Sequence, residues 1–380
     1  ERVIAVLRMA EALSPKYQVV VANPPYMGGK GMNGQLGDFA KKEYPEGKSD
    51  MFAAFIERGF DLIRRNGYSA MVTMQSWMFL SSYEKLRIKL NDESHIVNMA
   101  HMGNMVMGIA FGTSATVWKQ GKNASKPGNF FYVDYADLSE DKVPVSFPPQ
   151  NARNSKQKDC GWLYRASAND FEKIPGCPIA YWASKSVKNI FLSNKFNSSL
   201  EPKVGVQTGE NDRFVKCWAE VSAQKTSLFG RKTESSSIKW FPFNKGGDFR
   251  KWYGNRDYLI NWQFNGSEIK NLRPKSVVRN EKYYFKPSIS CSAITSAVVS
   301  HRYYPEGGIF DVNFRSNFGN SVEDLYIILG YLEAKVSRHL LGFLSSTMAL
   351  NGDDVRKLPL DQSHKFNSKP VERLVELSKC

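Results

Sequence analysis

Residues 23–26 of this chain read Asn-Pro-Pro-Tyr, and they follow an apolar run, Val19–Ala22. The run predicts a short buried strand. The two prolines end that strand, because proline has no backbone N–H for the ladder and restricts the residue before it. The pattern therefore predicts a stiff loop at the C-terminal end of a strand, which is where open α/β sheets bind ligands.

The side chains of this loop suit a flat base that carries an amino group. The side-chain oxygen of Asn23 and the carbonyl of Pro24 can each accept one amino hydrogen of adenine. Both bonds would raise the electron density on the amine as it attacks a methyl sulfonium, while Tyr26 stacks on the base. A base in a duplex must first be flipped out. The alternative is that Asn23, Pro24, Pro25 and Tyr26 form only a proline turn.

Length and charge favour a two-domain protein with a polyanionic partner. The chain has 380 residues, 42% of them hydrophobic, which is enough for two cores. Its 52 Lys and Arg outnumber 37 Asp and Glu, giving a net charge of +15, and 13% of residues are aromatic. Basic and aromatic residues together favour nucleic acid, although a basic protein with no such partner is the alternative.

Cysteine, histidine and hydropathy patterns limit the other classes. The five cysteines are scattered, without a close pair, so no zinc site or disulfide framework is predicted and a reducing compartment is expected. The five histidines show no metal spacing, so no metal is predicted. No apolar run is long enough to span a bilayer, and no membrane partner is expected.

Hydrophobic periodicity predicts alternating strands and helices in the first part of the chain. A helix is expected over 49–65, with Ser49 as its N-cap, and strands over 68–73, 96–99 and 113–119. This rhythm predicts an α/β fold with a parallel sheet. After the polar stretch 121–128 the alternation fades into short aromatic and β-branched segments, with a clear helix beginning at Glu323.

Several blocks of the sequence together resemble a known family. They are the Asn-Pro-Pro-Tyr loop, 27–33 (MGGKGMN), 48–59 (KSDMFAAFIERG) and 205–214 (GVQTGENDRF). The loop is similar to the motif of DNA methyltransferases that form N6-methyladenine. The other blocks resemble the PglX methyltransferases of BREX-type phage-defence systems, and the resemblance covers most of the chain.

The resemblance implies a domain plan and a cofactor. Residues 1–122 would be the C-terminal half of a Rossmann-like methyltransferase sheet, 123–345 a mixed α+β target-recognition domain, and 346–380 a tail. S-adenosylmethionine would be the methyl donor, bound in part by Asn23 and Asp50. Because no Gly-rich cofactor strand precedes Asn23, the chain is expected to be a fragment that lacks the cofactor half of its sheet and is inactive alone.

The resemblance also implies further site residues. Phe111 would be the second aromatic ring that sandwiches the flipped base opposite Tyr26; alternatively, it is a core residue entering a strand. Asp50 lies at a motif position near the cofactor, but its place at the start of a helix also explains it as a partner of the helix dipole.

Two segments are candidates for contact with double-stranded DNA. In 205–214, the side chains of Gln207, Thr208, Asn211 and Arg213 can bond base edges or phosphates. In 245–256, Arg250, Lys251 and Arg256 are interleaved with aromatic residues. The alternative for 205–214 is a solvated hairpin loop. The alternative for 245–256 is that its aromatic rings pack inward and leave the charges in solvent.

The resemblance implies site-specific adenine-N6 methylation of DNA in a phage-defence or restriction–modification system of the bacterial cytoplasm, with other defence proteins as partners. One alternative is a fused type IIG restriction–modification enzyme. Another is a DNA-binding specificity module without catalysis, and methylation of RNA or of protein glutamine by the same loop chemistry is a third. The sequence does not predict the recognition site, the oligomeric state or the base-reading residues.

Overall fold

The computed structural model describes residues 2–141, 163–192, 200–228, 237–292, 299–344, 352–359 and 368–378. Two of the five cysteines, Cys160 and Cys380, lie outside these ranges. The chain divides into two compact units, 1–192 and 193–380. The boundary expected at residue 122 falls within the first unit, between two strands of one sheet. Within the described residues, no helix is long and apolar enough to cross a membrane.

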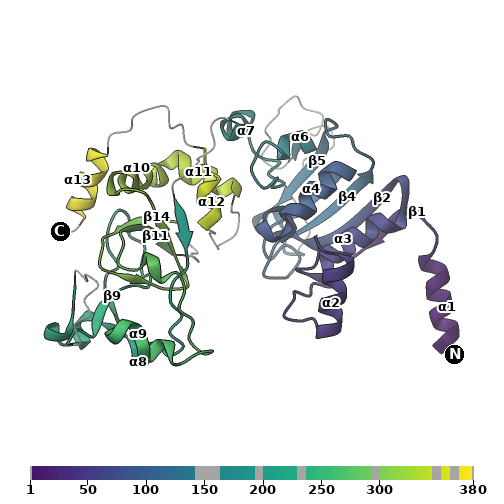
Figure 1. Cartoon of the computed structure of the whole chain (residues 1–380). Helices are drawn as coiled ribbons and strands as arrows, with labels where there is room; N and C mark the ends of the chain where they lie inside the picture. The colour runs from purple at the N-terminus through teal and green to yellow at the C-terminus, as the bar shows by residue number, and fades with distance from the viewer. Residues whose placement is uncertain are drawn as a thin grey trace. The chain divides into compact units, whose positions relative to one another are not determined.

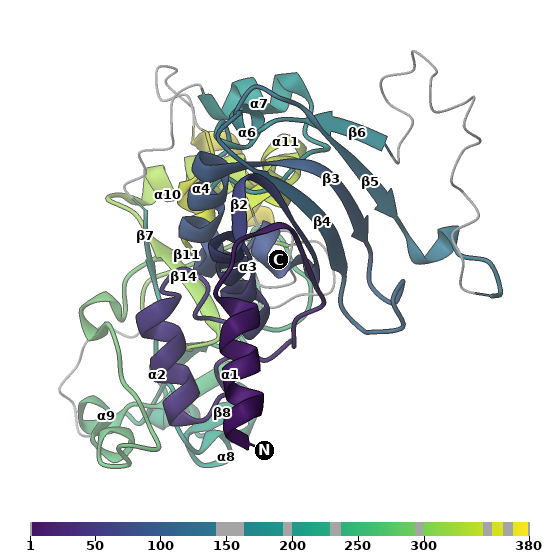
Figure 2. The ribbon, with the colours of Figure 1, turned by 90° about the vertical axis from the view of Figure 1, so that its right-hand side faces the viewer.

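The first unit is built around a six-stranded sheet with the order β1-β2-β4-β3-β5-β6. Its strands are β1 (Tyr17–Ala22), β2 (Ile63–Met74), β3 (Ser94–Met102), β4 (Thr113–Gln120), β5 (Gly128–Val133) and β6 (Leu163–Ala166). Its helices are α1 (Arg2–Leu13), α2 (Gly34–Glu43), α3 (Met51–Leu62), α4 (Glu84–Glu93), α6 (Ala168–Phe171) and α7 (Lys185–Leu192). Short 3₁₀ turns cover Gln75–Met78, Ser81–Tyr83 and Tyr135–Asp137. Figure 2 labels β2 to β6, and Figure 1 labels β1 beside β2.

The α/β class is confirmed, but the prediction of a parallel sheet is only partly right. β1 pairs with β2 and β3 pairs with β5 in parallel, whereas β4 runs antiparallel to both β2 and β3. The reason is the short loop between β3 and β4, residues 103–112, which has no crossover helix and so returns the chain antiparallel. β5 and β6 extend the same sheet beyond residue 122.

Helices α3 and α4 pack on one face of this sheet (Figure 1). The buried face of α3 includes Phe52, Ile56 and Gly59, as its spacing predicts, while Phe55 remains exposed. Gly59 lies so close to β2 that an added Cβ would come within 2.5 Å of the Met71 side chain. A side chain at this position would displace the ends of the Met71 and Ser69 side chains, so glycine allows α3 to approach β2 closely.

The second unit contains two four-stranded sheets, ordered β13-β9-β10-β8 and β12-β11-β14-β7. Their strands are β7 (Glu201–Lys203), β8 (Val215–Cys217), β9 (Trp240–Asn244), β10 (Tyr258–Asn261), β11 (Ser288–Ser292), β12 (Arg302–Tyr304), β13 (Ile309–Phe310) and β14 (Phe314–Phe318). The helices are α8 (Asn211–Phe214), α9 (Gln263–Lys270), α10 (Val322–Glu333), α11 (Lys335–Leu344), α12 (Gly352–Arg356) and α13 (Lys369–Leu377), with 3₁₀ turns at Trp218–Glu220, Ala223–Lys225 and Glu281–Tyr283.

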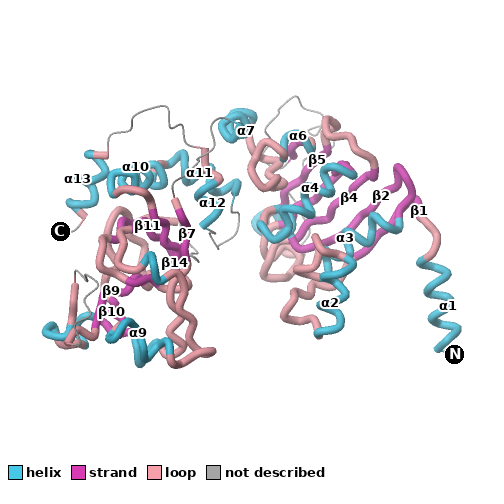
Figure 3. Tube along the Cα trace, viewed as in Figure 1, coloured by secondary structure: helices cyan, strands magenta, loops and turns pink. Residues whose placement is uncertain are grey.

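Long loops join these short strands, as Figure 3 shows, and aromatic residues fill the space between them. One core cluster contains Phe214, Phe243, Trp262, Tyr284 and Phe310 among its buried residues. Many of the aromatic residues in this part of the chain therefore stabilise the fold. The late helix begins at Val322 with Ser321 as its cap, and it ends at Glu333, so Val336 belongs to α11 and is exposed.

Candidate active site and DNA-contact segments

The Asn-Pro-Pro-Tyr loop leaves the C-terminal end of β1, as the sequence predicts. The prediction that this strand is buried is wrong for the described structure: β1 lies at the edge of the sheet, and Val19 and Val21 are exposed. Asn23 is exposed, Pro24 is buried, and the Tyr26 ring is half-buried against the core of the first unit. Pro24 thus anchors the loop while the amide of Asn23 faces solvent. This arrangement leaves the amide accessible to a substrate at the edge of the sheet.

Two phenylalanines hold the Tyr26 ring edge to face. Its centroid lies 6.2 Å from that of Phe52 at an interplanar angle of 89°, and 5.8 Å from that of Phe111 at 68°. The Tyr26 hydroxyl is 3.4 Å from the carbonyl oxygen of Val72. Burial raises the pKa of the Tyr26 phenol, so the ring is neutral at physiological pH.

Phe111 lies beside Tyr26, in the loop between β3 and β4, as the sandwich hypothesis requires. The two rings touch edge to face, which leaves no gap for a base between parallel planes. A base stacked on Tyr26 would therefore need Phe111 to turn. The contact is consistent with the predicted pairing of the two rings, but the sandwich itself remains a hypothesis.

Asp50 holds the segment that follows Tyr26. Its Oδ1 accepts hydrogen bonds from the backbone N–H of Met27, at 2.9 Å, and of Phe52, at 3.3 Å. It is thus the N-cap of α3, in place of the predicted Ser49. The backbone N–H of Met51 donates back to the carbonyl of Met27 at 3.0 Å. Burial raises the pKa of the Asp50 carboxyl, although these backbone hydrogen bonds oppose the shift.

This geometry predicts the outcome of two substitutions at Asp50. Asp50→Ala removes the cap and the acceptor for Met27, and we expect it to lower stability by roughly 1–2 kcal/mol and to reduce activity, because the loop loosens. Asp50→Asn keeps an acceptor oxygen and should preserve both. Thermal unfolding and methyl-transfer assays measure the two effects. An Asp50→Asn protein that is stable but binds the methyl donor weakly would instead indicate that the charge contacts the cofactor.

A hydrogen-bonded chain of buried residues supports the Phe111 loop. Gln75 donates its backbone N–H to the carbonyl of Gly112 at 3.0 Å, and its Oε1 lies 2.6 Å from Nε2 of His101. Nδ1 of His101 lies 2.8 Å from the Tyr181 hydroxyl. Burial lowers the pKa of His101 to about 4, so the imidazole is neutral, donating to Gln75 and accepting from Tyr181.

Sequence reasoning did not assign these supporting residues to the site. An added Cβ on Gly112 would lie 2.5 Å from the end of the Gln75 side chain, so a larger residue beside Phe111 would displace the Gln75 amide. Gln75 and His101 are far apart in sequence from Asn23, and no motif connects them. The nearest signal was the pattern Gly-Ile-Ala-Phe-Gly-Thr at 108–113, whose second glycine is the one that Gln75 contacts.

The segment 205–214 is anchored to the second unit rather than forming a free hairpin. Gln207 is exposed, and its backbone exchanges two hydrogen bonds of 2.8 Å with Val277. Thr208 is buried and donates to Oδ1 of Asn211 at 2.6 Å. Arg213 is exposed, and it forms ion pairs with Glu210 at 3.5 Å and Glu268 at 3.1 Å. The side chain of Gln207 and the amide nitrogen of Asn211 thus remain the better-placed candidates for DNA contact.

The basic segment 245–256 is mostly engaged within the fold. Lys251 forms an ion pair of 3.4 Å with the buried carboxylate of Glu333. Arg256 donates to the Tyr253 hydroxyl at 2.6 Å and lies over the Tyr304 ring. Arg250 is exposed. Lys251 and Arg256 therefore have partners within the fold. Of the three predicted DNA contacts in this segment, Arg250 is the one whose residue is exposed.

The predicted cofactor residues fit the methyl donor unequally. The side chain of Asn23 is exposed, so its amide is accessible to a ligand. The carboxylate of Asp50 already accepts two backbone N–H groups, which makes it an anchor of the loop first. Within the described residues, no cluster of three or more His, Cys, Asp or Glu side chains is arranged to hold a metal ion.

Comparisons with known proteins identify relatives along the whole chain. The family model "Eco57I restriction-modification methylase" matches residues 7–106. Adenine-specific methyltransferase BrxX of Escherichia coli O9:H4 (strain HS) is 36% identical over 99% of this chain and 30% of its own length. Adenine-specific methyltransferase PglX of Lacticaseibacillus casei (strain Zhang) is 37% identical over 94% of this chain and also 30% of its own length.

A solved structure shares the fold over nearly the same extent. It is a nuclease-deletion mutant of the Type ISP restriction-modification enzyme LlaGI in complex with a DNA substrate mimic. The match covers 97% of this chain and 42% of that one, with a TM-score of 0.54 and 12% sequence identity. The architecture of both units therefore recurs in a restriction–modification enzyme. The chain spans 30% of the length of the two curated relatives.

Proposed function

We propose that this chain, whose sequence is related throughout to the adenine-specific methyltransferases BrxX and PglX, carries the target-base loop and a DNA-contacting unit of an adenine-N6 DNA methyltransferase. The observation that supports this most strongly is the Asn-Pro-Pro-Tyr loop at the end of β1, with the Asn23 amide exposed and the Tyr26 ring packed beside Phe111. The host process would be phage defence or restriction–modification.

In this proposal the residues of the loop act on a flipped adenine. The Asn23 side-chain oxygen and the Pro24 carbonyl accept the two amino hydrogens, which orients the nitrogen lone pair and stabilises the positive charge that develops on it. Tyr26 stacks on the base once Phe111 turns aside. S-adenosylmethionine, when bound, would supply an electrophilic methyl group. The adenine nitrogen would displace the sulfur at the methyl carbon directly, so no covalent intermediate with the protein forms.

The second unit would contact the DNA duplex. Support comes from the net charge of +15 and from the exposed side chains of Gln207, Asn211 and Arg250. Phosphate contacts would fix the orientation of the duplex, and contacts with base edges would select the site. A purely DNA-binding module is less well supported, because the loop retains the residue types that the transfer chemistry needs, and the amide of Asn23 is exposed.

The test is a methyl-transfer assay with the full-length protein. Purified protein is incubated with S-adenosylmethionine labelled in its methyl group and with duplex DNA, RNA or a protein substrate in parallel. We expect label in N6-methyladenine of the DNA, identified by mass spectrometry of the digested nucleosides. Label found instead in RNA or in glutamine side chains, with none in DNA, would contradict the proposed substrate.

A further inference from the structure

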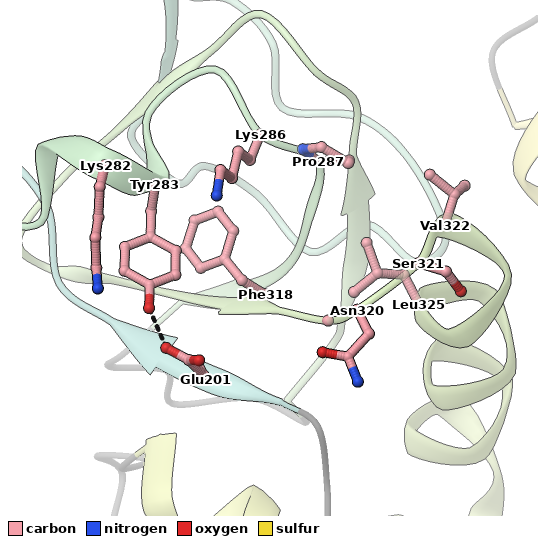
Figure 4. A pocket seen from close by; sticks show the side chains of 11 residues that line it. Glu201, Lys282, Tyr283, Lys286, Pro287, Phe318, Asn320, Ser321, Val322 and Leu325 are labelled. Carbon is pink, nitrogen blue, oxygen red and sulfur yellow. Dashed lines mark hydrogen bonds between the residues drawn. The ribbon is translucent and has the colours of Figure 1, made fainter.

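A cavity of about 460 Å³ lies in the second unit, apart from the segments discussed above. Figure 4 shows that Lys282 and Lys286 line one side of it, whereas Asn320, Val322 and Leu325 line the other, with Phe318 between them. Its volume is within the range of pockets that hold one small organic ligand. The cavity thus combines a cationic side, an aromatic ring and an amide.

The cationic side gathers around one aromatic ring. The ammonium groups of Lys203, Lys282 and Lys286 lie 4.8, 5.2 and 5.4 Å from the centroid of the Tyr283 ring. The one facing carboxylate is that of Glu201, which pairs with Lys203 at 2.9 Å and accepts a hydrogen bond from the Tyr283 hydroxyl. Those two hydrogen bonds, from Tyr283 first, lower the pKa of Glu201, so it is ionised.

These charges do not balance. Glu201 is paired with Lys203, which does not line the cavity, so Lys282 and Lys286 contribute positive charge to the lining that this carboxylate does not neutralise. Two such ammonium groups on one side of a cavity attract an anion. The opposite side of the cavity cannot serve this purpose, because Ser321 caps α10 and the first turn of the helix carries Glu323 and Asp324. The anion must therefore sit at the lysine side.

The remaining walls of the cavity suit the sugar and base that are attached to the phosphate of a nucleotide. The Phe318 ring and the Leu325 side chain offer an apolar surface, and the Asn320 side chain, which is labelled in Figure 4, offers a donor and an acceptor. A sugar and base attached to a phosphate need this combination: one apolar face and a few polar groups. An inorganic ion would use only the lysine side.

We propose that this cavity binds one nucleotide unit of the DNA strand, with its phosphate at Lys282 and Lys286 and its sugar and base against Phe318. The assignment of the phosphate ester to DNA rests on the function proposed above. The inference that the cavity suits a phosphate ester rests only on the residues that line it. The cavity would thus act as a fixed contact point for the strand outside the segments 205–214 and 245–256.

The test measures duplex binding by the double variant Lys282→Ala/Lys286→Ala. Fluorescence anisotropy with a labelled 20-base-pair duplex should show affinity about tenfold weaker at low salt. The slope of log Kd against log salt should become shallower by about one to two units, since each lost phosphate contact removes roughly 0.9. Lys282→Arg/Lys286→Arg keeps the charge and should restore binding. The matched control is Lys225→Ala/Lys335→Ala, which removes two exposed lysines that do not line the cavity.

Competition experiments separate the possible sources of the phosphate. AMP and inorganic phosphate are added to the preformed complex, and also titrated alone against the chain. Millimolar AMP that displaces little duplex supports the DNA assignment. The DNA assignment would be overturned if AMP bound at micromolar concentration through both lysines while duplex affinity stayed unchanged in the double variant. It would also be overturned if the double variant and the control lost duplex affinity equally. Because adenine methylation by the full-length protein is measured separately, failure here does not test the target-base loop.

Discussion

Asn23→Ala should lower adenine methylation by at least about a hundredfold, the scale of losing one preorganised partner of a developing charge. The reason is that the exposed amide of Asn23 is placed to accept an amino hydrogen, and alanine leaves that hydrogen without a partner. Stability and duplex affinity should change little, because Asn23 lies at the surface and makes no core contact. Nucleoside mass spectrometry of DNA from cells producing the full-length variant measures the effect.

Substitutions at Tyr26 sharpen the interpretation. Tyr26→Phe keeps the ring and loses only the long contact of 3.4 Å with Val72, so it should retain most activity. Tyr26→Ala removes a stacking surface worth roughly 1–3 kcal/mol and should be severely impaired. Asn129→Ala, which replaces a partly exposed asparagine on β5, is the matched control. Near-normal N6-methyladenine with Asn23→Ala would refute the role of the loop.

Local patterns in the sequence predicted the placement of this loop because the determinants are local. The valine run and two prolines specify a strand end, and the structure has β1 end at Ala22. The helix over Met51–Leu62 follows from its hydrophobic spacing. The cap was assigned to Ser49 instead of Asp50 because both residues are good caps, and only the position of Met27, more than twenty residues earlier, distinguishes them.

The parts that were not predicted depend on contacts between distant segments. The antiparallel direction of β4 follows from a loop whose length allows several topologies. The support of Phe111 by Gln75 and His101 joins three segments that no periodicity relates. Lys251 and Arg256 were predicted to contact DNA, because basic residues next to aromatic residues are typical of DNA-binding segments. In the structure they contact Glu333 and Tyr304, which come from distant parts of the chain.

The contact between Lys251 and Glu333 belongs to a buried cluster that should dominate the stability of the second unit. Glu333 Oε1 lies 3.2 Å from Nδ1 of His301 and 2.6 Å from its backbone nitrogen, and both side chains are fully buried. Burial lowers the pKa of His301, but hydrogen bonds from its surroundings, with Cys291 and Glu333, outweigh this and raise it to about 9. The imidazole is therefore positively charged at neutral pH, and Glu333 is its counter-ion.

Glu333→Ala should destabilise the second unit by roughly 3–5 kcal/mol, because it leaves a buried charge without a partner. In the unsubstituted chain, the pKa of His301 is higher in the folded state than the ordinary 6.5. Its contribution to stability is thus full below pH 6.5 and is lost as the pH rises through about 9. The Cys291 thiol, buried beside this cluster, reports opening of the unit through its labelling rate in urea at pH 6, 7.5 and 9.5. Each rate is divided by that of the fully unfolded chain at the same pH, because thiolate formation alone speeds labelling as the pH rises.

Glu323→Gln is the matched control for Glu333, because it removes a carboxylate from the exposed first turn of the same helix. We expect it to leave the pH profile of Cys291 labelling unchanged and to lower stability by less than about 1 kcal/mol through the helix dipole. Labelling of Cys177, in the first unit, shows whether the effect of Glu333→Ala is confined to the second unit. If the Glu333→Ala protein loses as much stability between pH 7.5 and 9.5 as the unsubstituted chain does, then His301 does not carry the charge that its pKa implies. The cluster would then stabilise the unit by packing alone.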